Sequence, residues 1–162
     1  MPQANPPPSE PATPHQKITP YRQVAALCLR RSQADTQVLL ITSRDTGRWI
    51  IPKGWPIKGL KDSEAAAQEA WEEAGVRSAD VTEHPIGTYT YDKVLKNGRI
   101  KPICAAIYMT KVAELADNYP ERKQRTRRWF DLSEAATRVR EPRLQQVFQQ
   151  VSKTLPAYAD QI

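Results

Sequence analysis

Residues 54–76 (GWPIKGLKDSEAAAQEAWEEAGV) constrain the fold more than any other part of this 162-residue chain. After a glycine-containing loop, an alanine-rich segment carries helical spacing and ends at Gly75, the residue type that most often follows the last helical turn. We expect this helix over residues 63–74, with Asp62 or Ser63 as its N-cap. Its alanines would allow close packing against a sheet, so the segment predicts a strand, a loop and a helix in that order.

Three glutamates, Glu69, Glu72 and Glu73, fall on one face of this helix, because residues three and four apart are neighbours on a helix. Like charges at this spacing repel by roughly 0.2–0.5 kcal/mol per pair. Clustered glutamates more often form a solvated acidic face, and Glu73 has Arg77 four positions downstream as a partner. Glu69 and Glu72 have no such partner. The cluster and the loop before it therefore favour a site for a divalent cation, and hard oxygen ligands with vacant positions suit Mg²⁺.

This segment resembles the signature of the Nudix hydrolases. In that signature a glycine is followed after five residues by glutamate and, after seven more, by Arg-Glu-aliphatic-x-Glu-Glu-x-Gly-aliphatic. The positions in register are Gly54, Glu69, Ala70, Glu72, Glu73, Gly75 and Val76. Leu60 stands where the signature has its first glutamate, and Gln68 replaces an arginine that in the family helps to hold the acidic cluster. Over roughly residues 20–150, the chain resembles the branch of diphosphoinositol polyphosphate and diadenosine polyphosphate phosphohydrolases.

The resemblance implies an α+β fold, a Nudix-type α/β/α sandwich with a mixed sheet. It also implies a Mg²⁺-dependent hydrolase, with Mn²⁺ as a second candidate cation. Glu69, Glu72 and Glu73 would be both the catalytic and the metal-binding carboxylates. Glu69 and Glu73 would be the principal ligands and Glu72 a ligand or the general base, with a backbone carbonyl at Lys53 or Gly54 completing the shell. The substrate would be a dinucleoside polyphosphate or a diphosphoinositol-like polyphosphate.

Recognition of several phosphates requires cationic side chains around the three glutamates. Lys53 is the first choice, because it lies one residue before the glycine of the signature. The other candidates for substrate binding are Arg48, Arg44, Arg22, Lys58 and Arg125. Trp55 either stacks on a nucleobase or, as is more common for a tryptophan between a glycine and a proline, packs to stiffen its own loop.

The rest of the chain predicts a sheet around this helix. Strands are expected over residues 22–30 and 36–42, over 49–51, over 88–94 and 100–110, and over 127–130. The first two would form a hairpin, and Asn97-Gly98 favours a tight turn between the strands over 88–94 and 100–110. Two further helices are expected over residues 132–139 and 142–153. In the second, an apolar stripe of Leu144, Val147, Phe148 and Val151 indicates core packing.

Composition indicates a single domain. Half of the 14 prolines lie in the first twenty residues, so we expect a disordered, proline-rich leader over residues 1–19, a Nudix domain over 20–155 and a tail over 156–162. Cys28 and Cys104 lie in apolar runs and are expected to be buried free thiols. The sequence shows neither a secretory signal nor an apolar run long enough to span a bilayer, so we expect a cytoplasmic protein without a membrane partner.

A net charge of +6 favours an anionic partner. The charge alone does not distinguish among nucleic acid, a membrane surface and a small polyphosphate. One alternative to the polyphosphate hydrolase is removal of pyrophosphate from the 5′ end of RNA. Basic tracks with interleaved aromatics would support it, and here the aromatics are scattered along the sequence. The other is a catalytically weak Nudix-like module that binds a ligand or nucleic acid, which the residues Leu60 and Gln68 motivate. The sequence sets neither the oligomeric state nor the bond cleaved.

Overall fold

The computed structural model describes residues 20–33 and 35–159. The elements of this part of the chain are β1 (Tyr21–Ser32), β2 (Asp35–Thr42), β3 (Trp49–Ile50), β4 (Lys53–Gly54), α2 (Asp62–Ala74), β5 (Val76–Val81), β6 (Gly87–Val94), β7 (Ile100–Leu115), β8 (Arg127–Asp131), α3 (Leu132–Arg138) and α4 (Pro142–Ala159). The predicted leader over residues 1–19 lies outside the described residues, so the expected domain boundaries stay predictions.

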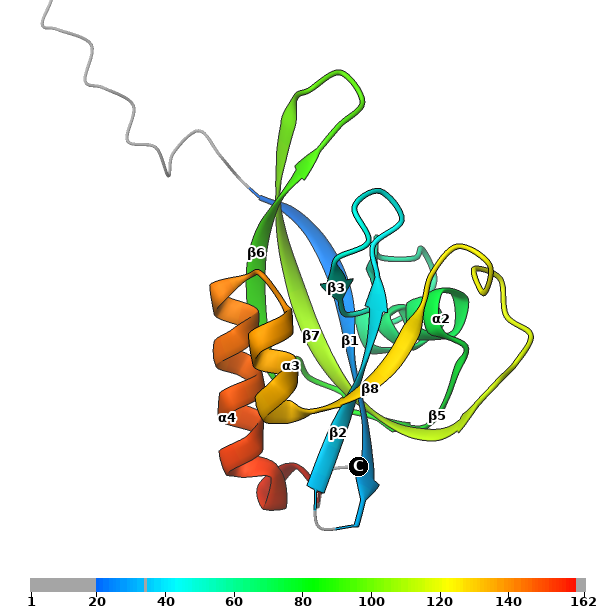
Figure 1. Cartoon of the computed structure of the whole chain (residues 1–162). Helices are drawn as coiled ribbons and strands as arrows, with labels where there is room; N and C mark the ends of the chain where they lie inside the picture. Colours follow the sequence, from blue (N-terminus) through cyan, green and yellow to red (C-terminus); the bar gives the residue numbers. More distant parts are fainter. Residues whose placement is uncertain (1–19, 34, 160–162) are drawn as a thin grey trace, which may run out of the picture.

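One mixed sheet organises the molecule, and β1 lies near its centre (Figure 1). β1 pairs in parallel with β7, from Tyr21↔Ile103 to Leu29↔Lys111, and antiparallel with β2 and β4. On one side, β3 and β8 pair with β2, and on the other, β5 and β6 pair with β7, all of them antiparallel. A single parallel pairing among these antiparallel ones makes the sheet mixed, as predicted.

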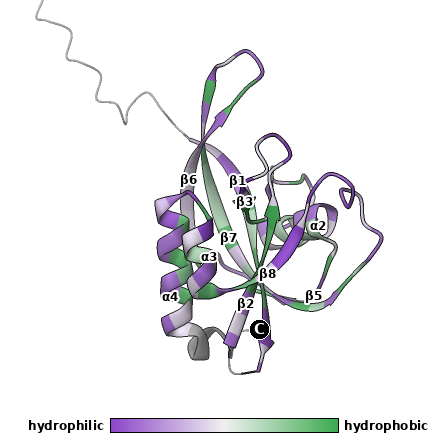
Figure 2. Cartoon of the chain, in the orientation of Figure 1, coloured by the Kyte–Doolittle hydropathy of each residue, from purple (hydrophilic) through white to green (hydrophobic). Residues whose placement is uncertain are grey.

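Two hydrophobic cores lie on opposite faces of this sheet, because successive residues of a strand point to opposite sides. Leu27 and Leu29 of β1 belong to the core with α3 and α4, where the predicted apolar stripe of the last helix is buried. Ala26 and Cys28 belong to the other core, which the alanines of α2 complete. Figure 1 shows α2 on one side of the strands and α3 with α4 on the other, and Figure 2 shows hydrophobic residues along the strands. The predicted α/β/α sandwich is confirmed.

The strands that the sequence did not predict are short or irregular. β4 has two residues, too few to carry an alternating pattern. β5, with the sequence VRSADV, pairs with β7 through shifted registers at Arg77, Ser78 and Asp80, which breaks the alternation of buried and exposed positions. β7 continues past its predicted end to Leu115, where β5 provides its pairing partner.

Helix α2 differs from the prediction at its start and agrees at its end. Its N-cap is Lys61, so the predicted cap at Asp62 or Ser63 is wrong. The reason is Glu64, whose carboxylate accepts a hydrogen bond from the Lys61 backbone N–H at 3.1 Å, as in a capping box. Gly75 ends the helix in the left-handed conformation, with φ of 68°, as predicted.

Both cysteines are free thiols. Cys28 is fully buried in the α2-side core, and burial raises the pKa of its thiol far above the ordinary value. Cys104 is only half-buried, so its predicted burial is wrong: it alternates along β7 with Ile103 and Ala105 of one core, on the face of Ala106 and Tyr108, but belongs to neither core. Among the described residues, no helix combines the length and apolar character that a bilayer span requires.

Candidate active site

A pocket of about 560 Å³ lies beside β4 and the glutamate face of α2. The loop after β2, the end of β6 and the loop before β8 complete its walls. Six of the predicted site residues line it: Glu69, Glu73, Arg44, Arg48, Lys53 and Arg125. The fold therefore brings together segments from four separate parts of the sequence around two of the three predicted carboxylates.

The main chain at Gly54 lies directly against the carboxylate of Glu69. β4 positions Gly54 by pairing it with Val24 of β1, and α2 positions Glu69. A Cβ added at Gly54 would collide with the carboxylate carbon and both oxygens of Glu69. Only glycine permits this approach, which gives a physical reason for the glycine that opens the signature.

Glu73 is buried, with 4% of its residue surface exposed. Its carboxylate lies 3.6 Å from a guanidinium nitrogen of Arg125 and accepts a hydrogen bond from the backbone N–H of Lys53 at 3.4 Å. The alternative partner considered from the sequence, Arg77, instead pairs with Glu114 at 2.9 Å, because β5 and β7 place them side by side. Glu73 is therefore not part of a solvated acidic face.

Arg125 connects Glu73 to a residue that the sequence did not single out. The Arg125 side chain is 8% exposed, contacts Glu121 at 3.2 Å and donates a hydrogen bond to the Thr42 carbonyl oxygen at 3.1 Å. Glu121 also lines the pocket, but it belongs to an irregular loop with no periodic pattern. Its spacing of four residues from Arg125 was the one signal available. Arg125, predicted to bind substrate, is thus placed to hold two carboxylates.

Two of the three glutamates that line the pocket, Glu69 and Glu73, hold their protons more tightly than ordinary carboxylates. Burial, reinforced by the negative charges of Glu73 and Glu72, raises the pKa of Glu69 to about 7. Burial also raises the pKa of Glu73 to about 7, against the opposing effects of Arg125 and Lys53. Carboxylates that are costly to ionise together are the groups that a divalent cation stabilises. The residues present therefore fit the cation that the resemblance implies.

Glu72 has different surroundings from the other two glutamates. It does not line the pocket, and its carboxylate accepts a hydrogen bond from the side-chain amide of Gln68 at 3.1 Å. Within the described part of the chain, no three Asp, Glu, His or Cys side chains are grouped closely enough to hold an ion. The predicted three-glutamate cluster is thus divided in this structure between Glu69 with Glu73 in the pocket and Glu72 beside Gln68.

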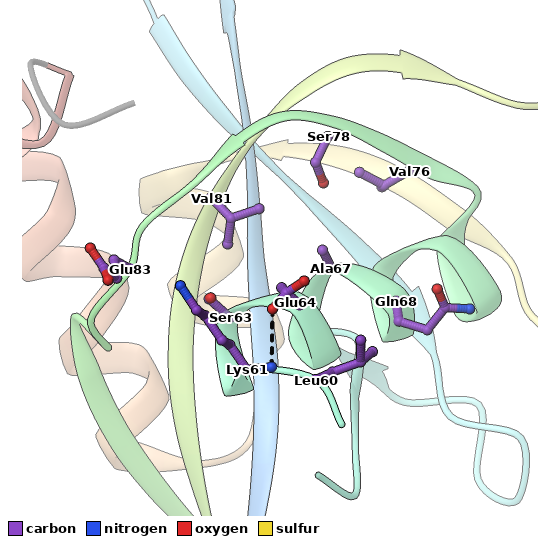
Figure 3. Close-up of a pocket in the computed structure, with 10 residues that line it drawn as sticks. All are labelled: Leu60, Lys61, Ser63, Glu64, Ala67, Gln68, Val76, Ser78, Val81 and Glu83. Atoms are coloured by element: carbon purple, nitrogen blue, oxygen red, sulfur yellow. Dashed lines mark hydrogen bonds between the residues drawn. The ribbon is translucent and has the colours of Figure 1, made fainter. Parts of the chain in front are cut away.

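The two departures from the signature, Leu60 and Gln68, lie together in a second pocket of about 810 Å³ between α2 and β5. Figure 3 shows both side chains in this pocket, with Val76 and Ser78 of β5 above the helix. Neither residue lines the glutamate pocket. Leucine and glutamine at these two positions, in place of the glutamate and arginine of the signature, are therefore not among the residues around Glu69 and Glu73 in the pocket. Gln68 contacts Glu72 instead.

The predicted substrate-binding cations have different surroundings. Arg22 pairs with Asp62 at the start of α2, because β1 passes beside that end of the helix, and it does not line the pocket. Lys58 is exposed in the loop before α2 and does not line it either. Arg44 lies 3.5 Å from Glu121, and Arg48 lies 2.6 Å from Glu141.

Lys53, the first choice among these cations, lies in the pocket with its ammonium 4.9 Å from the ring centroid of Tyr91. Burial lowers the pKa of Lys53, and Glu73 opposes this effect. Among the described side chains it forms no ion pair. Lys53 is therefore the predicted cation best placed to meet a phosphate above the glutamates.

Comparison with known proteins adds to this geometry. Residues 21–151 match the NUDIX domain. The chain is 36% identical over 109 residues to Nudix hydrolase 16, mitochondrial, of Arabidopsis thaliana, an alignment that covers 65% of this chain and 59% of that protein. It is 28% identical over 116 residues to diphosphoinositol polyphosphate phosphohydrolase 3-beta of Homo sapiens, covering 70% of this chain and 66% of that protein. The chain thus spans at most about two thirds of the length of these curated relatives.

Among solved structures, the Ap4A hydrolase of C. elegans in a binary complex superposes with a TM-score of 0.63 at 20% identity, covering 85% of this chain and 98% of that one. The NUDIX domain of Shewanella oneidensis NrtR, complexed with ADP ribose, superposes with a TM-score of 0.62 at 15% identity, covering 88% of this chain and 93% of that one. At sequence identities this low, the structural similarity shows a shared fold and no more.

Proposed function

Because the chain belongs to the Nudix family, we propose that it is a pyrophosphohydrolase that depends on a divalent cation and cleaves a phosphoanhydride bond in a small polyphosphate. The observation that carries the proposal is the pair of carboxylates, Glu69 and Glu73, whose pKa values are raised to about 7 at a pocket that also contains Lys53. The names of the similar proteins, which include a diphosphoinositol polyphosphate phosphohydrolase and an Ap4A hydrolase, support this substrate class.

Glu69 and Glu73 would hold the cation, Mg²⁺ or as second candidate Mn²⁺, with Glu72 and the backbone carbonyl at Lys53 as the further predicted ligands. When bound, the ion neutralises charge on the phosphate oxygens and makes a bound water more acidic. The Lys53 ammonium binds non-bridging phosphate oxygens, and Arg125 keeps Glu73 in place through its contacts with Glu73 and Glu121. A carboxylate accepts the proton of the attacking water, and Glu72, predicted as a ligand or as this base, would have to turn from Gln68 toward the pocket to do so.

The direct test is a substrate panel. Purified protein is incubated with diadenosine tetraphosphate, a diphosphoinositol polyphosphate, inorganic tripolyphosphate and 5′-triphosphorylated RNA, each with Mg²⁺, with Mn²⁺ and with EDTA. We expect cation-dependent release of phosphate or of a phosphorylated product from at least one of them. A folded protein that leaves every substrate intact in both metals would instead point to the catalytically weak binding module.

Glu73→Gln is the variant that connects turnover to the site. Glutamine has nearly the same shape as glutamate but no charge. Circular dichroism should therefore show an intact fold, while turnover falls by at least about 100-fold. Unchanged turnover would place the reaction elsewhere on the molecule. The cytoplasmic location predicted from the sequence stays a proposal, which fractionation of the source cells tests.

A further inference from the structure

Two exposed aromatic rings meet at the rim of the glutamate pocket. Trp55, just after β4, lines the pocket, and Tyr21 begins β1. Their ring centroids lie 6.4 Å apart at an interplanar angle of 84°. Trp55 is 41% exposed and Tyr21 is 50% exposed. The structure thus brings together aromatics that are far apart in the sequence, and Trp55 does not bury its ring in its own loop.

Two lysines from the hairpin of β6 and β7 lie over these rings. The ammonium of Lys101 is 4.1 Å from the ring centroid of Tyr21 and 5.2 Å from that of Trp55, and the ammonium of Lys93 is 5.6 Å from that of Trp55. Figure 1 shows this hairpin beside the start of β1, in agreement with the pairing of Tyr21 with Ile103. Lys93 lines the pocket, so the aromatic and cationic surface continues into the phosphate site.

The two lysines are directly opposite each other in the ladder of β6 and β7. Like charges in cross-strand positions destabilise a sheet. Neither lysine forms an ion pair with any described side chain. An anionic ligand at this point would relieve their repulsion, and the long, flexible lysine stems would let each ammonium move from a ring face to a phosphate.

We propose that Tyr21, Trp55, Lys93 and Lys101 form a nucleotide subsite, in which a nucleobase stacks on Trp55 while the two lysines bind phosphates leading into the glutamate pocket. The subsite rests on the proposed pyrophosphohydrolase activity and specifies its substrate as a nucleoside polyphosphate. Base stacking on an exposed aromatic ring is a strong and sequence-tolerant interaction, and cations beside it bind the phosphates.

A diphosphoinositol ligand would need a different surface. Its ring offers no π face, and its many phosphates demand cations without carboxylate partners. Three of the four arginines that line this pocket are paired: Arg44 lies 3.5 Å from Glu121, Arg48 lies 2.6 Å from Glu141, and Arg125 contacts both Glu73 and Glu121. Only Arg140 among them makes no ion pair with a described side chain. The rings at the rim and the neutralised arginines together favour a ligand with a base and a short phosphate chain.

The experiment compares two substrates in each of several variants. With Mg²⁺, kcat and KM are measured for diadenosine tetraphosphate and for inorganic tripolyphosphate, which carries no base. Trp55→Ala should raise KM for the dinucleotide about 10-fold, as expected for one lost stacked base. Its kcat, and both constants for tripolyphosphate, should stay within about twofold. Trp55→Phe should restore most of the loss, since it retains a ring.

Trp71→Ala is the control, because the Trp71 ring on α2 also lies beneath a cation, with the Arg77 guanidinium 4.8 Å from its centroid, but is half-buried and does not line the pocket. It should leave KM for the dinucleotide unchanged. Lys101→Met gives a second signature. It should weaken dinucleotide binding about 10-fold and change the thermal midpoint of the free protein little, because relief of the repulsion with Lys93 offsets the loss of the contacts with the two rings. A purely structural lysine would instead change the midpoint and leave binding unaltered.

Binding of a methylene-bridged, non-hydrolysable analogue of diadenosine tetraphosphate, measured by calorimetry, separates the subsite from the activity. Weaker binding to Trp55→Ala than to Trp71→Ala supports the subsite even if no substrate is hydrolysed. Absence of hydrolysis would contradict only the proposed function. Equal binding to both variants, with tripolyphosphate still hydrolysed, overturns the subsite alone. If 5′-triphosphorylated RNA is hydrolysed faster than the dinucleotide, and Trp55→Ala raises its KM by the same factor, the base and phosphates in the subsite are those of an RNA end.

Discussion

Arg125 and Gln68 divide between them the contacts that hold the acidic residues of α2. Gln68 occupies the position of the signature arginine and donates to Glu72 at 3.1 Å. Arg125 comes from the loop before β8 and contacts Glu73 and Glu121 from the other side of the pocket. An uncharged residue at position 68 is therefore compatible with an ordered Glu73, because a cation distant in sequence contacts that carboxylate.

Removing this cation should affect both stability and turnover. Arg125→Met removes the guanidinium that contacts the buried Glu73 and leaves Glu121 with Arg44 alone, so we expect the free energy of unfolding to fall by about 2–4 kcal/mol. Turnover should fall by at least about 10-fold, because a displaced Glu73 no longer holds its geometry. Urea unfolding in EDTA measures the first quantity, and steady-state kinetics on the folded protein measures the second.

The matched control is Arg122→Met. Arg122 lies in the same loop but is exposed and makes no ion pair among the described side chains. It should change stability by less than about 0.5 kcal/mol and leave turnover unaltered. Equal effects of the two substitutions would show that loss of net charge, and not the contact with Glu73, is responsible.

The raised pKa of Glu69 predicts how stability depends on pH without metal. The folded pKa is about 7 and the ordinary value is 4.5, so between these values the folded protein binds more protons than the unfolded chain. Its stability therefore falls as the pH rises through this window. Glu69→Gln removes the contribution of Glu69 and leaves that of Glu73, so in EDTA it should stabilise the protein at pH 8 and much less at pH 4.5.

Thermal unfolding of the wild type and of Glu69→Gln across pH 4.5 to 8 measures this difference. Mg²⁺ added at pH 8 should raise the midpoint of the wild type more than that of the variant, because binding to the folded state stabilises it. Glu83→Gln, at an exposed position outside the glutamate pocket, is the control. Parallel pH curves for wild type and Glu69→Gln would contradict the burial of this carboxylate.

At the scale of elements, the contact between β4 and α2 positions the first glutamate. Gly54→Ala would place a methyl group on the carboxylate of Glu69, and since that carboxylate ends a flexible side chain, it should turn away while the backbone keeps its place. We expect a stability change of less than about 1 kcal/mol with a loss of about 100-fold in kcat/KM. Kinetics together with urea unfolding test this separation.

Gly87→Ala is the control for Gly54→Ala. An added Cβ at Gly87, in β6, meets the nearest atom of Val147 at 3.4 Å, an ordinary contact, so turnover should be preserved. If both alanine variants lose activity equally, the close approach of β4 to Glu69 is not what sets the geometry of the site.

The elements also show why sequence patterns predicted one part of the site and missed another. α2 has a helical alanine face and a terminal glycine, and both signals are local, so its range and the placement of Glu69 and Glu73 were predictable. β4 exists only because it pairs with Val24 and Ala25 of β1, a partner distant in sequence. Glu121 becomes part of the site through contacts with Arg44 and Arg125, which no periodicity encodes.

At the scale of the whole molecule, the sheet separates the hydrophobic core beneath α3 and α4 from the layer of α2, which carries the glutamates. Leu144 of α4 is fully buried in the core that lies across the sheet from α2. Leu144→Ala should reduce the free energy of unfolding by about 3 kcal/mol. At 20 °C, kcat of the folded protein should be unchanged, because the glutamates belong to the opposite layer.

Gln149→Ala, on the exposed side of the same helix, is the control and should alter stability by less than about 0.5 kcal/mol. Thermal unfolding and kinetics below the transition measure both variants. A fall in kcat for Leu144→Ala while the protein remains folded would show that the two layers are mechanically coupled through the sheet.

The parallel pairing of β1 with β7 also determines when the active site can first exist during synthesis. Tyr21 meets Ile103, and Arg125 follows later still, so the glutamate helix leaves the ribosome well before the strand and the loop that enclose it. Contacts between such distant residues form late and slow the folding of the whole domain. A nascent chain that has just completed α2 therefore already has the strands β1 and β2 against which the alanine face packs, but it lacks β7 and the arginine that contacts Glu73.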